Sequence, residues 1–314
     1  MYGGILFQIV ILIVGFALLI KGSDFFVDGS SNVASLLKIP TIIVGLTIVA
    51  FGTSAPEAAV SITSSITGSN ALAVSNVIGS NLFNMLLIIG LCAILKDLKM
   101  AKPTLETDLP FLVVATVVCS VLMIIGLRFS RIDGIIALAI LIIYIYFIIR
   151  GIKKGKDEQS VSEAKMGLPR SIIYILGGLA GIVIGANFVV DSASNIAMAF
   201  GMSETLVGLT IVAMGTSLPE LATSITAIRK DEEELVIGNV LGSNIFNLLF
   251  VLGLSSAISP IAISPAMYVD ILLLVVVTIV FFIFGKTQDK FDRKEGIILL
   301  ILFIAYMAFA IIRN

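Results

Sequence analysis

Two glutamates of this chain stand in nearly identical surroundings. Glu57 ends the stretch Gly45–Glu57 and Glu220 ends the stretch Gly208–Glu220, and the two stretches agree at eleven of thirteen positions. Both lie in apolar runs, where placing a carboxylate at membrane depth costs at least ~3 kcal/mol. One such acid could be a tolerated residue beside a helix kink. Two at equivalent positions indicate a binding site for cations.

The residues beside each glutamate offer further oxygen atoms. Pro56 cannot donate to a helix ladder, and Gly52 eases unwinding. We therefore predict a broken helix, with one half ending near Gly52 and the other starting near Pro56. The break frees carbonyls around Ala50, Phe51 and Gly52, beside the hydroxyls of Thr53 and Ser54. The second copy repeats this set with Gly215, Thr216, Ser217, Pro219 and Glu220.

A second motif also occurs twice, as GSNLFN at Gly79–Asn84 and GSNIFN at Gly242–Asn247. Residues four apart share a helical face, so Ser80 lies with Asn84, and Ser243 lies with Asn247. These side chains present neutral oxygens, and the two glycines are expected to allow close helix approach. Four further asparagines could serve the same site or form hydrogen bonds between helices. They are Asn76, Asn81, Asn239 and Asn244.

These residue types select hard cations. The chain has no histidine, and its two cysteines, Cys92 and Cys119, lie in apolar runs where we expect buried small side chains. Oxygen ligands alone favour Na⁺, Ca²⁺ or Mg²⁺. Unwound backbone with two carboxylates suits Ca²⁺ better than Mg²⁺, which demands a strict octahedron. One Ca²⁺ or two Na⁺ would neutralise the two carboxylates, so a loaded site could cross a membrane more easily than an empty one.

The composition indicates the elements that must hold this site. The chain is 58% hydrophobic and 13% charged, which is typical of a polytopic membrane protein. Its apolar runs have helical length rather than the ~10-residue length of barrel strands. A net charge of −1 gives no support for nucleic-acid binding. We predict ten spans, of which the second and seventh are broken: roughly 4–36, 41–66, 71–95, 108–126, 132–150, 170–200, 204–228, 235–257, 266–284 and 295–312.

The distribution of lysine and arginine predicts how the chain is oriented in the membrane. With the N-terminus outside, 16 of the 20 Lys and Arg residues fall in cytoplasmic loops and three fall outside. We therefore expect both termini outside the plasma membrane and the central linker, residues 151–169, in the cytoplasm.

An internal repeat organises the chain. A shift of 163 residues aligns Gly22–Ala93 with the second half without a gap. The linker separates residues 1–150 from residues 170–314, with five predicted spans in each. An odd number of spans inverts the second unit, and inverted repeats with a site at their interface are the architecture of secondary transporters.

The paired GTS-x-PE and GSN-x-FN motifs and the five-plus-five repeat resemble the Ca²⁺/cation antiporter superfamily, most closely its prokaryotic Na⁺/Ca²⁺ exchangers. The resemblance implies an all-α fold in which spans two, three, seven and eight surround the ions while spans one and six slide. It implies Glu57 and Glu220 as central Ca²⁺ ligands. It adds the carbonyls of Thr53 and Thr216, and those of Ala50 and Ala213 for Na⁺. Ser54, Ser217, Ser80 and Ser243 would line the Na⁺ sites, and Asn84 is the family's amide in span three.

One position departs from some members, which have an aspartate where this chain has Asn247. An acid there is associated with K⁺ co-transport, so Asn247 argues against K⁺ dependence.

We expect a Na⁺/Ca²⁺ antiporter that acts by alternating access as a monomer in the lipid bilayer, with transported ions and no cofactor. The alternative is exchange of Ca²⁺ or another divalent cation for H⁺ on the same fold, because glutamates can carry protons. An ion channel or an intramembrane enzyme lacks a matching motif.

Overall fold

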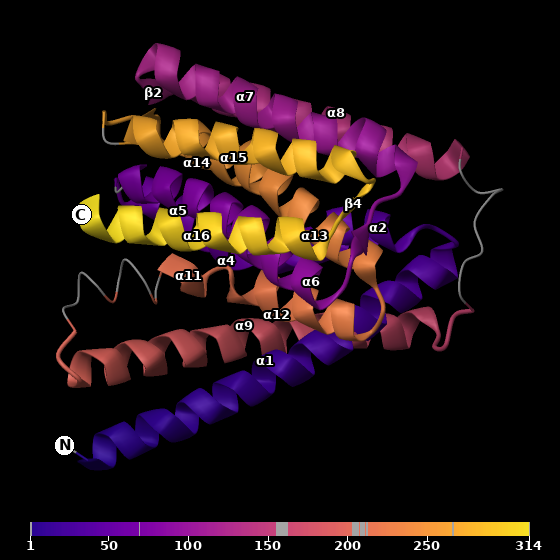
Figure 1. Ribbon diagram of the computed structural model, residues 1–314, viewed down its shortest axis with the longest axis horizontal. Coiled ribbons are helices and arrows are strands. Elements are labelled where there is room, and N and C mark those ends of the chain that lie inside the picture. Colours follow the sequence, from indigo (N-terminus) through magenta and orange to yellow (C-terminus); the bar gives the residue numbers. More distant parts are fainter. Residues whose placement is uncertain are drawn as a thin grey trace.

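The computed structural model describes residues 2–68, 70–154, 163–202, 207, 211, 213–265 and 267–313. Long helices lie roughly side by side along the longest axis of the molecule, and the N- and C-termini lie at the same end (Figure 1). The helices of the first half are α1 (Tyr2–Leu37), α2 (Thr41–Val44), α3 (Ala50–Thr53), α4 (Ala55–Ile66), α5 (Asn70–Phe83), α6 (Ile89–Leu95), α7 (Leu109–Gly126) and α8 (Arg131–Lys154). Those of the second half are α9 (Leu168–Ala199), α11 (Ala213–Gly215), α12 (Leu218–Arg229), α13 (Glu233–Phe246), α14 (Leu252–Ile258), α15 (Met267–Thr287) and α16 (Arg293–Arg313).

Short π-helical segments and strands complete the described elements. The π-helical segments are η1 (Gly45–Val49), η2 (Asn84–Ile88), η3 (Thr104–Asp108) and η5 (Asn247–Val251). The strands are β1 (Leu98–Lys99), β2 (Arg128–Phe129), β3 (Ile261–Ala262) and β4 (Lys290–Phe291). They form two antiparallel pairs, β1 with β4 and β2 with β3, and so join loops that are far apart in the sequence.

Eight helices in the described residues are long and apolar enough to cross a membrane, and a bent pair, Thr41–Thr53 with Ala55–Ile66, makes up to nine. These nine match nine of the predicted spans within a few residues. Residues 204–206, 208–210 and 212 of the predicted seventh span lie outside the described part of the chain. The count of ten spans and the inversion of the second half therefore stay predictions.

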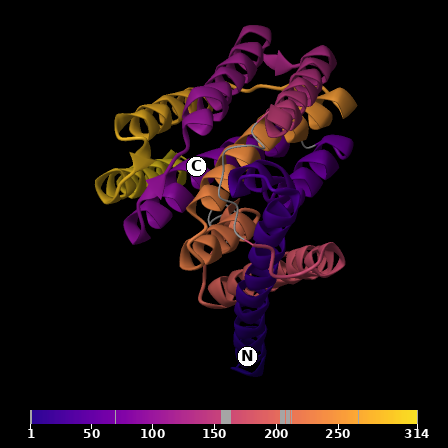
Figure 2. The same cartoon turned by 90° about the vertical axis from the view of Figure 1, so that its right-hand side faces the viewer.

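The first and sixth predicted spans form the long helices α1 and α9, which cross at one edge of the bundle (Figure 2). Glycines allow the crossing. A Cβ added at Gly178 would lie 2.5 Å from the backbone nitrogen of Phe26 and 2.7 Å from the carbonyl oxygen of Gly22. A Cβ at Gly185 would lie 2.7 Å from the carbonyl oxygen of Gly15. The two backbones therefore touch without intervening side chains.

Polar contacts fix α1 at its C-terminal part. The buried Asn32 amide donates to the Met166 carbonyl (2.7 Å) and to Ser171 Oγ (2.8 Å), and its oxygen accepts from the Lys165 amide (2.7 Å). The Lys230 ammonium, just after α12, lies 2.6 Å from the Asp28 carboxylate of α1. Helix α1 is thus attached both to the start of α9 and to the end of α12.

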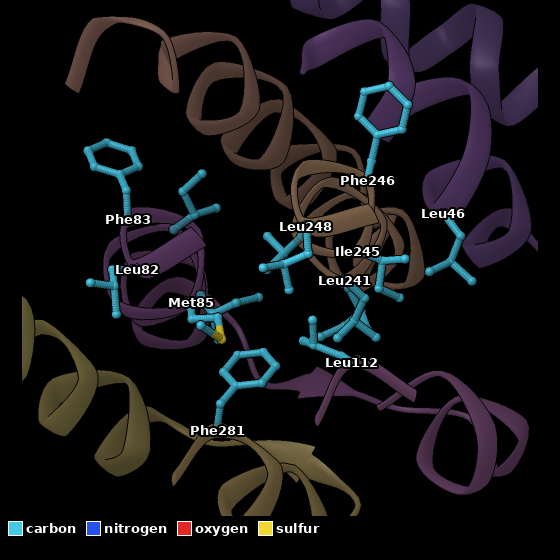
Figure 3. Packing of buried hydrophobic residues seen from close by; sticks show 14 of the residues in the cluster. Leu46, Leu82, Phe83, Met85, Leu112, Leu241, Ile245, Phe246, Leu248 and Phe281 are labelled. Carbon is cyan, nitrogen blue, oxygen red and sulfur yellow. The ribbon is translucent and has the colours of Figure 1, made fainter. Parts of the chain in front are cut away.

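The apolar core lies between α13, η5, η2, α7 and α15. Leu241, Leu248, Met85, Leu112 and Phe281 point into one space in Figure 3, and all five are fully buried. This packing surrounds the two GSN-x-FN segments with rigid apolar contacts, which suits a site whose ligands must stay in place.

A glycine-lined crossing brings α13 against the second span. A Cβ at Gly45 would lie 2.9 Å from the Cα of Gly238, and one at Gly242 would lie 2.7 Å from the Leu46 carbonyl oxygen. The prediction of close approach at Gly242 is therefore confirmed. Among the described residues, a Cβ at Gly79 would meet no atom within 4 Å. The residue equivalent to Leu46 in the second half, at position 209, lies outside the described residues, so close approach at Gly79 stays a prediction.

Candidate cation site

The second span is broken at the predicted place. Helix α3 ends at Thr53, Ser54 leaves the helical conformation with φ −85° and ψ 9°, and α4 starts at Ala55 with Pro56 in its first turn. The two parts are bent by 48°. Pro56 has no N–H, so the Gly52 carbonyl loses its usual helical partner. The second copy has the same break, because Ser217, with φ −91° and ψ 5°, precedes α12 and its proline.

The carbonyls at the two breaks are not equally free. The Ser54 amide donates to the Ala50 carbonyl (3.0 Å), because α3 continues as far as Thr53. The Thr53 hydroxyl also lies 3.5 Å from the Ala50 carbonyl oxygen, so the prediction that the break frees this carbonyl is wrong. In the second copy the Ser217 amide donates to the Met214 carbonyl (3.2 Å) rather than to Ala213, which lies in α11.

Glu57 and Glu220 are fully buried, and each accepts a hydrogen bond from the other repeat. Ser54 Oγ donates to Glu220 Oε1 (2.8 Å), and Ser217 Oγ donates to Glu57 Oε1 (3.1 Å). The two breaks therefore face each other, as a shared site requires. Neither glutamate has a cationic side chain among its described hydrogen-bond partners.

The GSN-x-FN serines approach the same carboxylates from their own repeats. Ser80 Oγ lies 3.5 Å from Glu57 Oε1, and Ser243 Oγ lies 3.5 Å from Glu220 Oε1. The structure thus brings together both predicted glutamates and all four predicted serines.

Several buried hydroxyls and four buried carboxylate or amide oxygens have no hydrogen-bond partner within the described residues; the four are Glu57 Oε2, Glu220 Oε2, Asn84 Oδ1 and Asn247 Oδ1. A buried polar atom without a partner costs free energy, so native structures rarely keep one without a reason. Carboxylate and amide oxygens are ligands of hard cations. Two related pairs of such oxygens therefore fit a cation site, as the residue types predicted.

The amide nitrogens of Asn84 and Asn247 are used between the repeats. Asn84 Nδ2 donates to Asn244 Oδ1 (3.1 Å), and Asn247 Nδ2 donates to Asn81 Oδ1 (3.1 Å). These bonds orient the two free Oδ1 atoms. Sequence reasoning left Asn81 and Asn244 open between ligands and helix–helix contacts, and the structure places them in such contacts.

Each of these ligand-bearing asparagines also begins a π-helical segment, η2 at Asn84 and η5 at Asn247. Single π-helical turns are frequent at functional sites because they turn a side chain away from its regular direction. No sequence feature predicted these π-helical segments. They start 163 residues apart, which is the offset of the internal repeat.

Threonines at the two breaks also bond to the opposite repeat. Thr53 Oγ1 donates to Asn239 Oδ1 (3.1 Å), and Thr216 Oγ1 donates to Asn76 Oδ1 (3.4 Å). Sequence reasoning did not single out Ser61 and Ser224, which accept from the Asn76 and Asn239 amides. The 163-residue shift pairs Ser61 with Ser224 and could have found them.

The described residues hold no group of three or more His, Cys, Asp or Glu side chains that could bind a metal. The candidate site instead combines two carboxylates with amide, hydroxyl and carbonyl oxygens. Asn247 stands where the sequence comparison with some members places a third acid, and the expectation of two acids stays a prediction.

Comparisons with known proteins identify the family of this chain. A sequence model of the family described as "Sodium/calcium exchanger protein" matches residues 7–150 and 170–312. The chain is 38% identical to the putative antiporter CaxA of Alkalimonas amylolytica over 95% of this chain and 96% of that protein. It is 28% identical to the sodium/calcium exchanger MaX1 of Methanosarcina acetivorans over 95% of this chain and 96% of that protein.

The fold matches a solved structure of the sodium-calcium exchanger NCX_Mj, soaked with 2.5 mM Na⁺ and 0.1 mM Ca²⁺, with a TM-score of 0.86. The two chains are 30% identical, and the match covers 96% of this chain and 98% of that one. Because the family match spans both halves and the fold match nearly the whole chain, this chain belongs to the sodium/calcium exchanger family of membrane antiporters.

Proposed function

We propose that this chain is a secondary active antiporter that exchanges Na⁺ for Ca²⁺ across the plasma membrane, as a monomer with both termini outside and the linker inside. The observation that carries the proposal is a set of four buried carboxylate and amide oxygens that have no partner within the described part of the chain. They belong to Glu57, Glu220, Asn84 and Asn247. Cations bound between the two repeats would give these oxygens the partners that they lack. The family match and the sodium–calcium exchangers among the relatives support Ca²⁺ and Na⁺ as the cations.

The ligands divide between the two ions. Glu57 and Glu220, with the carbonyls of Thr53 and Thr216, would hold Ca²⁺. The serines beside the two carboxylates, with the carbonyls of Ala50 and Ala213, would hold Na⁺. The two ionised carboxylates carry two negative charges, which one Ca²⁺ or two Na⁺ can neutralise. Either set of bound ions removes the free-energy cost of moving buried charge through a low-dielectric layer. Without bound ions, the site still carries that cost. This difference favours exchange over leak.

Unequal packing of the long helices supports alternating access. Helix α1 packs along α12, whereas the related pair in the described residues, α9 and α4, makes no comparable contact. In inverted-repeat transporters, exchange of two such arrangements between the repeats moves access from one side of the membrane to the other. Here α1 and α9 would supply the motion, and the core around α5 and α13 would hold the ions.

Exchange of Ca²⁺ for H⁺ is the second candidate. Buried carboxylates can bind protons in place of Na⁺, and Glu57 and Glu220 each have only hydroxyl side chains among the described hydrogen-bond donors. The neutral Asn247 leaves no third acid to carry an additional charge, which argues against a requirement for K⁺.

Purified protein in liposomes tests the proposal. Vesicles loaded with Na⁺ are diluted into Na⁺-free buffer that contains labelled Ca²⁺, at equal pH on both sides. We expect Ca²⁺ uptake that depends on internal Na⁺ and is unchanged when K⁺ is omitted. Vesicles loaded with choline chloride are the control. Uptake that follows an imposed pH gradient and ignores Na⁺ would replace the first candidate by the second.

A further inference from the structure

Four asparagines lie on the ligand-bearing faces of α5 and α13 and of the π-helical segments η2 and η5 that continue them, but they are used in two different ways. Asn76, Ser80 and Asn84 recur at intervals of four residues, as do Asn239, Ser243 and Asn247. Asn84 and Asn247 keep a buried Oδ1 without a partner. Asn76 and Asn239 do not, because their Oδ1 atoms accept hydrogen bonds from threonines.

The Asn76 amide joins three segments. Its Nδ2 lies 2.9 Å from Ser61 Oγ and 3.2 Å from the Glu57 carbonyl oxygen, both in α4. Its Oδ1 accepts from Thr216 Oγ1 at the break of the other repeat (3.4 Å). One side chain therefore holds the first turn of α4 and the threonine that precedes Ser217.

The Asn239 amide makes related contacts from the second repeat to the first. Its Nδ2 donates to Ser224 Oγ of α12 (3.2 Å), and its Oδ1 accepts from Thr53 Oγ1 (3.1 Å). Asn239 and Thr53 are both fully buried. Thr53 Oγ1 also lies 3.1 Å from the Val49 carbonyl oxygen and 3.5 Å from the Ala50 carbonyl oxygen, both in its own repeat. Asn239 is therefore the acceptor that joins the Thr53 hydroxyl to the other repeat.

We propose that Asn76 and Asn239 are positioning residues that couple the two half-sites, each by fixing the threonine at the break of the opposite repeat. A threonine whose hydroxyl is held has its χ1 fixed, and its neighbouring peptide groups are restrained with it. The carbonyls of Thr53 and Thr216 then point in one direction when an ion arrives. This inference rests on the proposed function, since it assigns those carbonyls to the ion.

Double-mutant cycles test the crossed pairing. Asn76→Ala removes the amide, and Thr216→Val removes the hydroxyl but keeps the carbonyl. Each change should raise the apparent KM for Ca²⁺ in the liposome assay about five-fold, the scale of one hydrogen bond, with little change in kcat. The double variant should show about the same five-fold rise, rather than the roughly 25-fold rise of independent effects. Thr216→Ser, which keeps the donor, should stay near the wild type.

The pair Asn76→Ala with Thr53→Val is the matched control, because those residues belong to the same repeat and share no hydrogen bond among the described contacts. In this control pair, the rise in apparent KM of the double variant should equal the product of the rises in the two single variants. The cycle of Asn239→Ala with Thr53→Val repeats the test at the other break, so a variant that fails to fold in one cycle leaves the other decisive. The Ca²⁺-induced rise in thermal stability of the purified variants gives a second readout that does not require transport.

Multiplicative effects in both crossed cycles, in variants that fold, would overturn the inference. Equal coupling in the crossed and same-repeat pairs would also overturn it, because it would indicate that the asparagines have a general structural role. Failure of the proposed function is distinguishable, since then wild-type vesicles would show no Na⁺-dependent Ca²⁺ uptake at all.

Discussion

Ser54 donates a hydrogen bond to Glu220 across 2.8 Å, although 166 residues separate them in the chain. The related bond from Ser217 to Glu57 runs in the opposite direction. Each break in a span therefore orients the carboxylate of the other repeat. Neither copy of the motif is a complete site, and any motion that separates the two breaks must also disturb both carboxylates.

Neutralising one glutamate should abolish Ca²⁺ transport. Glu57→Gln or Glu220→Gln leaves one charge to balance a divalent ion in a buried site, a loss on the scale of 2–5 kcal/mol for one partner of a buried charge pair. We expect Na⁺-dependent Ca²⁺ uptake to fall about 100-fold or more.

Glu106→Gln is the control for these variants, because Glu106 is exposed in η3 and makes no contact with the described site. It should transport at the wild-type rate. Near-normal exchange in either site variant would remove that glutamate from the set of central ligands.

Removing a crossed serine should weaken binding without abolishing it. Ser54→Ala deletes a hydrogen bond to a carboxylate, typically about 1.5–3 kcal/mol, so the apparent KM for Ca²⁺ should rise about 10-fold or more. The variant should couple with changes at Glu220 rather than at Glu57. Ser35→Ala, at a hydroxyl that bonds only to its own helix among its described contacts, is the matched control and should bind Ca²⁺ normally. Equal effects of the two changes would argue against a role for Ser54 in the site.

The crossing of α1 and α9 offers a paired glycine test. Gly178→Ala would place a Cβ 2.5 Å from the Phe26 backbone nitrogen, so the helices must separate. Overpacking of this kind typically costs about 1–3 kcal/mol, and the Tm of the purified protein should fall.

Gly177→Ala is the neighbouring control. A Cβ at Gly177 meets no atom of the described residues within 4 Å, and alanine favours a helix over glycine by up to ~1 kcal/mol. Its Tm should stay equal or rise slightly. A fall of similar size in both variants would indicate general sensitivity of α9 rather than close packing at Gly178.

A carboxyl between α12 and α13 should make stability depend on pH. Burial raises the pKa of Glu232 above its usual value, with repulsion from Glu233 and Glu234 adding to the effect. Because the folded pKa lies above the unfolded one, the ionised carboxylate destabilises the fold at neutral pH. This cost disappears below the unfolded pKa of about 4.3, where both states are protonated.

Glu232→Gln should therefore raise Tm at pH 7 to 8 and leave it unchanged near pH 4. The scan is run in detergent with Glu106→Gln as the control, which should show no such pH-dependent gain. A gain for Glu232→Gln that is the same at every pH would assign the effect to packing rather than to charge.

The sequence alone determined much of this protein. The repeat of 163 residues, the proline after Gly52 and the paired glutamates were enough to predict the break that the structure places at Ser54. Local chemistry decides such features, because a proline removes a helix donor wherever it stands. The same reasoning named the two glutamates and four serines that the structure brings together in the candidate site.

The tertiary structure decided which of these residues hydrogen-bond to the opposite repeat and which keep a free oxygen. Whether Asn84 and Asn76, two turns apart on one face, keep a free oxygen depends on which side chains of the other repeat they meet. The π-helical turns at Asn84 and Asn247 and the retained bond to the Ala50 carbonyl also depend on packing between distant segments. Side-chain periodicity specifies which face a residue occupies, but the partners of a hydrogen bond across 160 residues exist only once both repeats are folded together.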